Sequence, residues 1–457
     1  MSAASGAGGG TAAGGASEGD VNTSPARAAW DARHGAPTRA LLDRDAGVFL
    51  HQSLSSPCLD AIVGAEGAYL VTLDGRRILD FHGNSVHQLG HGHPAVVAAI
   101  RAQMERLPFC PRRFTCEEAV AFAEKLVQLA GPPFGKVLLV PSGAAAIGVA
   151  LKLARLATGR HKTLSMWDAF HGANLDAISV GGEALFRKDV GPLLPGTEHL
   201  PPPGLARRFF GDDDQATDRL ADYIDYVLEV QGDVAALIAE PVRWTTVEPP
   251  PEGFWAKVRA SCTRHGALLV FDEIPSALGR CGSFYVFEQM GCVPDMVALG
   301  KGLGGGIVPQ AALVVRGDLD VAPHLALGHY THEKSPLGSA AGLAAIGVIE
   351  AEGLIARACA LGEAGGAALA AMAARRPEIA AVRRMGAFFG VELRDLDGVA
   401  AAARADRVMY AALERGLSFK VGGGKVLTLC PPLTISDRDF RRALEILEEA
   451  LGAVHAG

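Results

Sequence analysis

Residues 267–282 read ALLVFDEIPSALGRCG, and residues 294–306 read PDMVALGKGLGGG. In both stretches a short apolar run ends in charged residues, Asp272-Glu273 in the first and Lys301 in the second. Runs of this kind suit strands that are buried on both faces, with amphipathic stretches between them as crossover helices. The pattern predicts an α/β layered domain. Similar runs occur in KVLLVPSG (136–143), KTLSMW (162–167), ALIAEP (236–241) and AALVVR (311–316).

The composition is that of a globular protein. The chain has 457 residues, of which 49% are hydrophobic and 20% charged, enough to bury a sizeable core. This length accommodates two or three domains, or one large α/β unit with a smaller partner. The 43 Lys and Arg against 50 Asp and Glu give a formal net charge of −7. This mild acidity argues against nucleic acid as the main partner, but it allows a local basic pocket for an anion.

The first twenty residues are rich in Gly, Ala and Ser. They lack the basic and apolar segments of a secretory signal, so we expect a disordered tail. The 8 cysteines are scattered and form no CxxC motif, which favours reduced thiols in the cytoplasm over a disulfide or zinc framework. No uninterrupted apolar run approaches the roughly 18–20 residues of a membrane span. We therefore expect a soluble, cytoplasmic protein without a membrane partner.

Lys301 directly follows an apolar run and is surrounded by glycines. A lysine at a strand end, with no neighbouring carboxylate in the sequence, is placed to be desolvated. Desolvation lowers the pKa of an amine and suits a Schiff-base nucleophile, although a surface lysine in a glycine loop would have the same sequence. The stretch also matches GxGxxG at Gly300, Gly302 and Gly305, but it leads into another strand, which disfavours a dinucleotide site.

Asp272 and Glu273 close the run at 268–271. At least one carboxylate should therefore lie near the carboxyl edge of the sheet, where ligands of α/β proteins bind. A buried carboxylate needs a partner, and a protonated pyridine nitrogen would supply one. A helix-capping acidic pair is the alternative interpretation.

VPSGAAAIGVALKLAR (140–155) predicts a strand, a turn of small residues and a helix. The free N–H groups at the helix start and the Ser142 hydroxyl would form an anion cradle, but ordinary N-capping explains Ser142 equally well. Phe170 in WDAFHGA (167–173) could stack on a planar cofactor or belong to the core.

The histidines of HQLGHGHP (87–94) have a loose metal-like spacing. A glycine-proline turn would hold them poorly, and no carboxylate or cysteine joins them in the sequence, so we expect no metal site. Just before them, AYLVTLDGRRILDF (68–81) predicts a hairpin with a type I′ turn at Asp74-Gly75. Beyond about Leu337, Ala-rich helical stretches are interrupted by the strand patterns of GAFFGVEL and VLTLCPP, which indicates a smaller α+β domain.

Taken in order along the chain, these features resemble the class III aminotransferases, pyridoxal 5'-phosphate (PLP) enzymes of fold type I. The resemblance runs from about Phe49 to the end of the chain. It implies an aspartate-aminotransferase-like large domain with a mostly parallel sheet over 96–336. A smaller α+β domain would combine 26–95 with 337–457, after a tail over 1–25. The motifs that carry it are SGAAAIGVALKLAR, FHG, AEPV, LLVFDEIPSALGRCG, PDMVALGKGLGGG, YTHEKSPLGSAAGLAAI and PPLTIS.

The resemblance also implies roles for single residues. Lys301 would bind the cofactor aldehyde and Asp272 the pyridine nitrogen, which makes both the expected catalytic residues. Phe170 and Ile274 would pack on the two faces of the ring. Thr331 would lend its hydroxyl to the phosphate of the neighbouring subunit, which implies a homodimer with shared active sites and leaves a tetramer open. The other expected cofactor-binding residues are Ser142, Gly143, Ala144, His171 and Glu240.

Three departures from the family pattern bear on the substrate. SGAA (142–145) replaces SGTEA, and THEKSP (331–336) replaces TFGGNP. Thr428 stands where the family commonly has an Arg that grips a substrate carboxylate, a clamp that keto-acid exchange needs. New basic residues would instead suit a tetrahedral anion such as a phosphonate, although each could be a solvated surface residue. They are Arg112, Arg113, Arg243 and Lys334, with Lys420 in addition.

Segments such as PCLDAIVGAEGAYL (57–70), FCPRRFT (109–115) and YTHEKSPLG (330–338) are most similar to a phosphonate-degrading branch of the class. That resemblance implies an ammonia-lyase for an amino phosphonate, in which Lys301 removes a proton from the amine-bearing carbon and no keto acid is consumed. An ω-aminotransferase would share every cofactor residue and is the first alternative. A protein that keeps the fold without catalysis and an aminomutase are the others.

Overall fold

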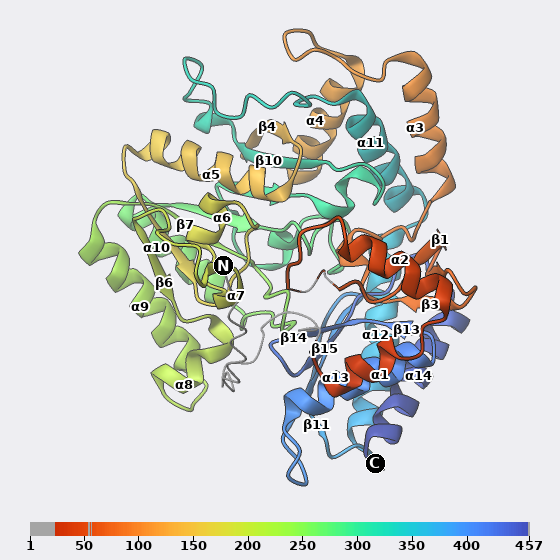
Figure 1. Cartoon of the computed structure of the whole chain (residues 1–457). Coiled ribbons are helices and arrows are strands. Elements are labelled where there is room, and N and C mark those ends of the chain that lie inside the picture. Colours follow the sequence, from red (N-terminus) through yellow and green to blue (C-terminus); the bar gives the residue numbers. More distant parts are fainter. Residues whose placement is uncertain (1–22, 54, 56, 456–457) are drawn as a thin grey trace, which may run out of the picture.

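The computed structural model describes residues 23–53, 55 and 57–455, so most of the expected tail over 1–25 lies outside the described residues. A seven-stranded sheet forms the centre of the molecule (Figure 1). All of its strands run parallel except β10, which is antiparallel to both of its neighbours. In sheet order the strands are β4 (Phe134–Val140), β10 (Ala311–Arg316), β9 (Met296–Leu299), β8 (Leu268–Asp272), β7 (Val234–Ala239), β5 (Lys162–Met166) and β6 (Thr197–Leu200).

The apolar runs of the sequence are strands because both faces of this sheet are covered. In β8, Leu269 and Phe271 belong to one hydrophobic core, and Val270 between them belongs to another. Helix α5 (Gly143–Thr158) packs in the second core, whereas α4 (Glu117–Ala130) and α10 (Phe254–His265) pack in the first. Successive side chains of a strand point to opposite faces of the sheet, so a strand that is buried on both faces needs apolar residues at every position. The α/β prediction with a mostly parallel sheet is thus confirmed.

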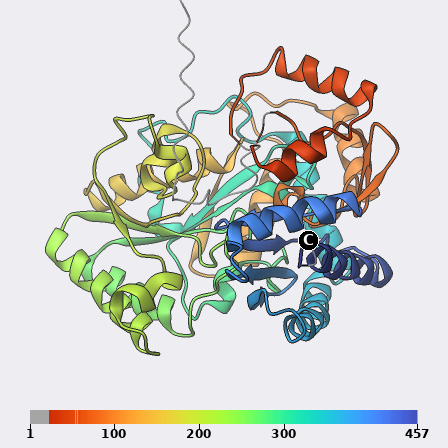
Figure 2. The same ribbon diagram turned by 60° about the horizontal axis from the view of Figure 1, so that its bottom comes forward.

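A second sheet joins the two ends of the chain. Its order is β1 (Ile62–Glu66), β2 (Tyr69–Thr72), β3 (Arg77–Asp80) and β13 (Leu417–Ser418), and β13 pairs parallel with β3. Accordingly, the red N-terminal ribbon lies beside the blue C-terminal ribbon in both views (Figures 1 and 2). Helix α1 (Pro25–Asp31) contacts α13 (Ala401–Glu414) in the same region.

The β2–β3 hairpin forms as predicted, but the prediction of a type I′ turn is wrong. That turn needs positive φ at both central residues, and only Gly75 has it, with φ of 83°. The Thr72 N–H donates to the Arg76 carbonyl at 3.0 Å, which leaves a three-residue loop closed by a left-handed glycine. A three-residue loop of this form places a single residue in the left-handed region, so Asp74 is not required to adopt it.

The C-terminal part forms a third sheet, with strand order β11 (Ile379–Met385), β12 (Phe388–Leu393), β15 (Val426–Leu429) and β14 (Lys420–Gly422). Helix α12 (Leu354–Ala373) packs on β11 and β12, and α14 (Asp437–His455) packs on α12 and α13. The remaining helices are α2 (Ala36–Ala46), α3 (Pro94–Arg106), α6 (Leu175–Val180), α7 (Ala184–Arg187), α8 (Ala206–Phe210), α9 (Ala216–Gln231) and α11 (Pro336–Ala351).

Helix α12 bears on the expectation that the chain has no membrane span. With 20 residues and a mean hydropathy of 1.3, it is long and apolar enough to cross a membrane by length and composition alone. It carries Arg357 and Glu363, and it packs Leu361, Leu369 and Met372 into the hydrophobic core. A core helix of a globular domain passes the same test, so its apolarity is explained by the sheet that it covers.

Candidate active site

The expected site residues gather where the parallel strands end. Asp272 is the last residue of β8, Glu240 follows β7, and Lys301 lies two positions beyond β9. Phe170 lies a few residues beyond β5, and Ser142 lies just beyond β4. The carboxyl ends of parallel strands share one edge of a sheet, and the loops at this edge are where α/β proteins bind ligands.

Asp272 is a buried carboxylate with two fixed partners. Its Oδ2 lies 2.8 Å from His171 Nδ1, and its Oδ1 accepts a hydrogen bond from the Ile274 N–H at 3.1 Å. His171 is buried as well, and within the described part of the chain its Nε2 has no hydrogen-bond partner. The histidine therefore orients the carboxylate and presents a second polar atom to the site.

Lys301 is held in a strained backbone conformation at the cavity wall. Its φ is 51°, at the start of the short 3-10 helix η4 (Lys301–Gly304). Its Nζ lies 5.4 Å from the ring centroid of Trp244. Burial lowers the pKa of Lys301, and the negative charges of Asp272 and Glu240 oppose that shift. A lowered pKa increases the fraction of neutral amine, which is the nucleophilic form.

The neighbouring carboxylates Asp272 and Glu273 have different tasks. Glu273 is fully buried and accepts hydrogen bonds from the N–H groups of Val286 at 2.5 Å and Phe287 at 2.8 Å. These are the first residues of the 3-10 helix η3 (Val286–Gln289). Both interpretations of the acidic pair therefore apply, one to each residue: Asp272 faces the site and Glu273 caps a helix.

The start of α5 forms a cradle of small residues. The Ser142 hydroxyl accepts a hydrogen bond from the Ala145 N–H at 3.2 Å and caps the helix. A Cβ on Gly143 would lie 2.6 Å from Ile274 Cδ1, so any larger residue would require the Ile274 side chain to shift. Ala144 packs closely under Gly172, where a Cβ would also clash. Capping and anion binding are compatible here, because a hydroxyl that accepts one hydrogen bond can still donate another.

A cavity of about 500 Å³ opens over Lys301. Phe170 lines it and packs against Phe186 with ring centroids 4.5 Å apart and the ring planes tilted by 40°. His82, Trp244 and three cations also line this cavity. The cations are Arg27, Lys301 and Lys420.

The described residues fit PLP. An amine of lowered pKa can take the aldehyde, and the buried Asp272 carboxylate offers a charge partner to a pyridinium nitrogen. The N–H groups at the start of α5 suit a phosphate, and Ile274 and Phe170 are apolar surfaces for the ring. The unpartnered His171 Nε2 is a further polar atom that a bound group could satisfy.

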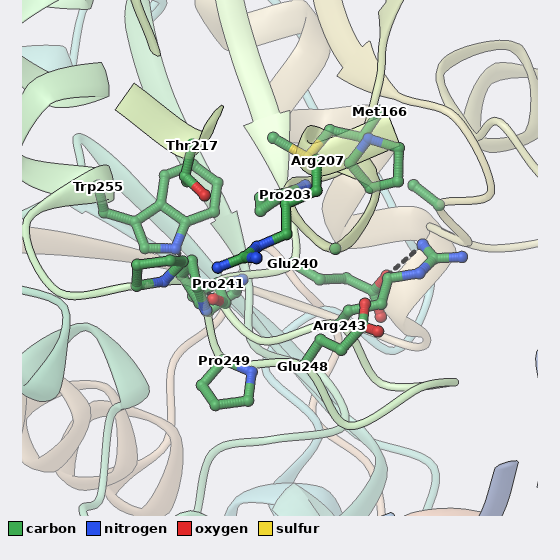
Figure 3. A pocket seen from close by; sticks show the side chains of 15 residues that line it. Met166, Pro203, Arg207, Thr217, Glu240, Pro241, Arg243, Glu248, Pro249 and Trp255 are labelled. Carbon is green, nitrogen blue, oxygen red and sulfur yellow. Dashed lines mark hydrogen bonds and ion pairs between the residues drawn. The ribbon is translucent and has the colours of Figure 1, made fainter. Parts of the chain in front are cut away.

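Glu240 and Arg243 point toward each other in a different cavity (Figure 3). Arg243 Nη1 lies 3.0 Å from Glu240 Oε2, and both side chains are largely buried. Burial raises the pKa of Glu240, and the charge of Arg243 opposes that shift. The two residues line a separate cavity of about 240 Å³, together with Arg207 and Glu248. Arg243 thus neutralises a buried glutamate and does not line the Lys301 cavity.

Of the other predicted anion-binding residues, Lys420 lines the Lys301 cavity, whereas Arg112, Arg113 and Lys334 are not among its described lining residues. Arg112 donates to the His329 carbonyl at 3.2 Å, and Arg113 is exposed. Lys334 lines a cavity of about 640 Å³ beside α4 and β4. Thr331 is also exposed. Within one chain, these residues form a group of their own on the loops before α4 and α11.

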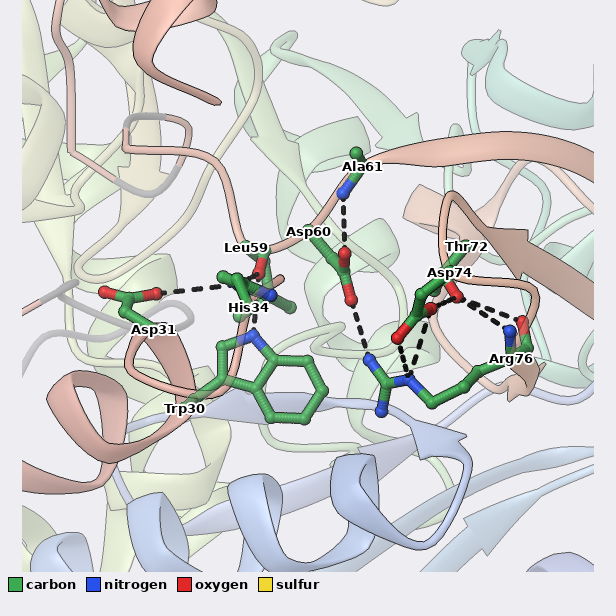
Figure 4. Close-up of polar contacts among 9 residues, drawn as sticks. All are labelled: Trp30, Asp31, His34, Leu59, Asp60, Ala61, Thr72, Asp74 and Arg76. Atoms are coloured by element: carbon green, nitrogen blue, oxygen red, sulfur yellow. Dashed lines mark hydrogen bonds and ion pairs between the residues drawn. The ribbon is translucent and has the colours of Figure 1, made fainter. Parts of the chain in front are cut away.

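Sequence reasoning missed Arg27, His82 and Trp244 as cavity residues. Arg27 lies far from every motif in sequence, and helix α1 brings it to the cavity. Its Nη2 donates to the carbonyls of Pro57 at 3.0 Å and Cys58 at 2.7 Å. The segment that follows is tied to α1 as well, because Trp30 Nε1 donates to the Leu59 carbonyl at 2.7 Å (Figure 4).

The backbone conformation of three consecutive residues next to His82 marks this part of the cavity wall as strained. Gly83, Asn84 and Ser85 all have positive φ, of 46°, 44° and 61°, and such strain concentrates at functional sites. The expectation that no carboxylate joins the nearby histidines is wrong. Asp80 Oδ2 lies 3.0 Å from His91 Nε2, and the hairpin brings that carboxylate to them.

Comparison with known proteins identifies relatives over nearly the whole chain. The family model for class-III aminotransferases matches residues 52–451. A (R)-1-hydroxy-2-aminoethylphosphonate ammonia-lyase of Vibrio splendidus is 45% identical, over 96% of this chain and 95% of that protein. An acetylornithine aminotransferase of Methanopyrus kandleri is 34% identical, over 91% and 99%. A solved amine transaminase from an uncultivated Pseudomonas species, in its PLP-bound form, is 28% identical with a TM-score of 0.83, over 89% and 99%.

Proposed function

The chain belongs to the class-III aminotransferase family and is a PLP-dependent enzyme, and from this we propose that it is an ammonia-lyase for (R)-1-hydroxy-2-aminoethylphosphonate. The products would be phosphonoacetaldehyde and ammonia, in the breakdown of phosphonates. The relative from Vibrio splendidus, 45% identical, supports this substrate.

One structural observation carries the choice of a lyase. Thr428, on β15, is buried, and its hydroxyl donates to the Thr245 carbonyl at 3.2 Å. This position therefore offers no guanidinium to clamp the carboxylate of an amino acid or keto acid. A transaminase has to bind two such partners in turn, whereas an elimination needs a single substrate.

The protein's own residues can perform the elimination. Bound PLP supplies an electron sink for the carbon that carries the substrate amine. Lys301 Nζ would take the proton from that carbon, and Asp272 would keep the pyridine nitrogen protonated. The adjacent carbon loses its hydroxyl, for which the newly protonated Lys301 can serve as the acid. The resulting imine reacts with water, so the water lost in elimination is regained, and the aldehyde and ammonia leave.

We also propose a homodimer in which each subunit contributes to the other's site, with a cytoplasmic location. Thr331, Phe114 and Val120 are exposed, and Val120 lies at the cavity beside α4 and β4. Apolar side chains around a cavity of this kind are typical of an interface. A partner on this surface would bring the loop of Thr331 next to a second site.

The alternative is an ω-aminotransferase, because every residue assigned to PLP would serve both reactions. The aminotransferase relative that is 34% identical supports it. The two reactions differ in one requirement. A transaminase stops after one half-reaction unless a keto acid returns the cofactor to its aldehyde form.

The test is ammonia release by the PLP-loaded enzyme from 1-hydroxy-2-aminoethylphosphonate without any keto acid. Turnover well beyond one ammonia per subunit, with equal formation of phosphonoacetaldehyde, is the expected result. The matched control adds pyruvate, which should leave the rate unchanged. Amino transfer only in the presence of pyruvate would establish the aminotransferase instead.

A further inference from the structure

We propose that Lys420 is the residue that binds the phosphonate group of the substrate and sets the preference for a doubly charged anion. This inference rests on the proposed function, because it concerns the same cavity. The sequence offered Lys420 only as one of several basic residues for the anion, and the family comparison assigns it no role.

The charged residues that line the cavity over Lys301 are all basic, although the carboxylates of Asp272 and Glu240 lie within electrostatic reach of Lys301. Four of the described residues that line the cavity can carry a positive charge, namely Arg27, His82, Lys301 and Lys420, and no Asp or Glu is among its described lining residues. The chain as a whole is acidic, with a net charge of −7. The basic residues that line the cavity therefore favour an anionic ligand there, even though the net charge of the protein is negative.

Among these cations, Lys420 is suited to hold the anion. Lys301 is engaged in the chemistry. Arg27 Nε donates to Asp31 Oδ1 at 2.8 Å, and its Nη2 is committed to backbone carbonyls. Burial lowers the pKa of His82, which favours its neutral form. Lys420 lines the cavity and is only 8% exposed, so water screens its charge weakly.

The strand pairing puts Lys420 next to the position that lacks the expected arginine. Lys420 on β14 is the direct cross-strand partner of Thr428 on β15. Directly paired residues project from the same face of a sheet, with Cβ atoms about 5 Å apart. A cation therefore stands beside Thr428 even though Thr428 carries none. The Lys420 side chain ends in an ammonium group, which binds a phosphonate oxygen as a point charge. An arginine would offer a planar guanidinium, whose two parallel N–H groups match a carboxylate.

Burial lowers the pKa of Lys420 to about 7. A dianion bound within hydrogen-bond distance would raise that pKa and hold the proton on the amine. The site is thus prepared to gain charge when a phosphonate enters. A neutral or singly charged substrate would gain less from the same lysine.

The experiment compares Lys420→Met and Lys420→Arg with the wild-type holoenzyme. Lys425→Met is the matched control, because Lys425 lies on the same hairpin, is half exposed and pairs with Glu392 at 2.6 Å. The change in visible absorbance of the bound cofactor is titrated with 1-hydroxy-2-aminoethylphosphonate. A second titration uses 2-aminoethanol, which carries an amine and a hydroxyl but no phosphonate. Thermal unfolding verifies that each variant is folded.

Lys420→Met is expected to raise the apparent Kd for the phosphonate roughly 10- to 100-fold, the range for loss of a charged hydrogen bond. Its Kd for 2-aminoethanol should stay within about twofold, and Lys420→Arg and Lys425→Met should remain near wild type with both ligands. Equal losses for both ligands, or no loss, would overturn the proposal. Should Lys420→Met fail to fold, Lys420→Gln replaces it with the same criteria.

The same measurements separate this inference from the proposed function. If the wild type binds the phosphonate in a Lys420-dependent way but releases no ammonia, the anion site stands and the lyase does not. If ammonia is released but affinity is independent of Lys420, the lyase stands and the anion site is wrong.

Discussion

Lys301 combines a strained backbone with a buried side chain whose Nζ lies near an aromatic ring. Its positive φ aims the side chain into the cavity, and Trp244 lies beneath its Nζ at 5.4 Å from the ring centroid. Trp244 in turn stacks on Phe388, with centroids 4.0 Å apart. Lys301, the proposed nucleophile, therefore lies against an aromatic pair that connects the central sheet to the C-terminal part.

Lys301→Ala should abolish the absorbance band of PLP that is linked covalently to the protein and lower ammonia release by more than about 100-fold, since both nucleophile and proton carrier are lost. Absorbance spectra of the purified protein with added PLP check the first expectation. Lys425→Ala should leave both properties unchanged. An unaltered spectrum in Lys301→Ala would remove Lys301 from the cofactor site.

Substrate affinity should depend on pH through Lys420. Its pKa of about 7 lies below the ordinary value, so the charged form is present below pH 7 and is lost as the pH rises through 7. The cavity also holds Lys301, Arg27 and His82, and Cys430 lies within electrostatic reach of Lys420.

The apparent Kd for the phosphonate should therefore rise above pH 7 in the wild type. In Lys420→Arg that rise should be absent, because arginine stays charged. Titrations between pH 6 and 9 test this. The ionisation of the phosphonate affects the Kd of the wild type and of Lys420→Arg equally, so it cancels in the ratio of the two values. A constant ratio across this range would contradict the expectation.

At the scale of elements, Asp295 joins α10, β8 and β10. Its buried carboxylate lies 2.5 Å from Arg259 Nη1 and 2.6 Å from Arg316 Nη1, and it accepts the Leu269 N–H at 2.7 Å. Asp295→Ala should lower the free energy of unfolding by about 3–5 kcal/mol, because two partly buried arginines lose their partner. Asp318→Ala removes a carboxylate that is 62% exposed, also paired with Arg316, and should cost below about 1 kcal/mol. Denaturant unfolding measures both variants.

Two helical glycines should respond oppositely to alanine. A Cβ on Gly362 of α12 would overlap the Gly386 carbonyl, whereas nothing lies within 4 Å of one on Gly347 of α11. Gly347→Ala should raise the free energy of unfolding by about 0.5–1 kcal/mol, since alanine favours the helix. Gly362→Ala should lower it by about 1–3 kcal/mol, because backbone has to shift. Equal melting temperatures would show that α12 does not approach Gly386 this closely.

The strands of the central sheet could be predicted from the sequence, whereas the contacts between the loops that follow them could not. The six apolar runs became strands because burial on both faces leaves a signal in every residue. Arg112 and Lys334 do not line the Lys301 cavity of their own chain, and no sequence pattern indicates which loops face one another. Arg27 was missed for the same reason: helix α1 reaches the cavity only through the pairing of distant segments.

At the scale of the whole molecule, the proposed dimer predicts a mass of twice 47.5 kDa in light scattering. Val120→Glu, on the exposed apolar side of α4, should shift the protein toward the monomer, because a charge would be buried at the interface. Ammonia release should fall with the dimer fraction if the sites are shared. Tyr226→Glu on α9 is a control with an exposed side chain of similar character. A monomeric wild type with full activity would contradict the shared site.

The second sheet has a consequence for biosynthesis. The Tyr69 hydroxyl donates to Asp439 Oδ1 at 2.9 Å across 370 positions of the chain, and β3 finds its partner β13 only near the C-terminus. At about 5–20 residues per second, a ribosome needs roughly 20–70 seconds between these two ends. Throughout that time the β2–β3 hairpin emerges with an open edge, which is prone to pair with other chains. We therefore expect chaperones to bind the nascent polypeptide. The cavity over Lys301, which Arg27 and Lys420 line, is completed only when the C-terminal part has been synthesised.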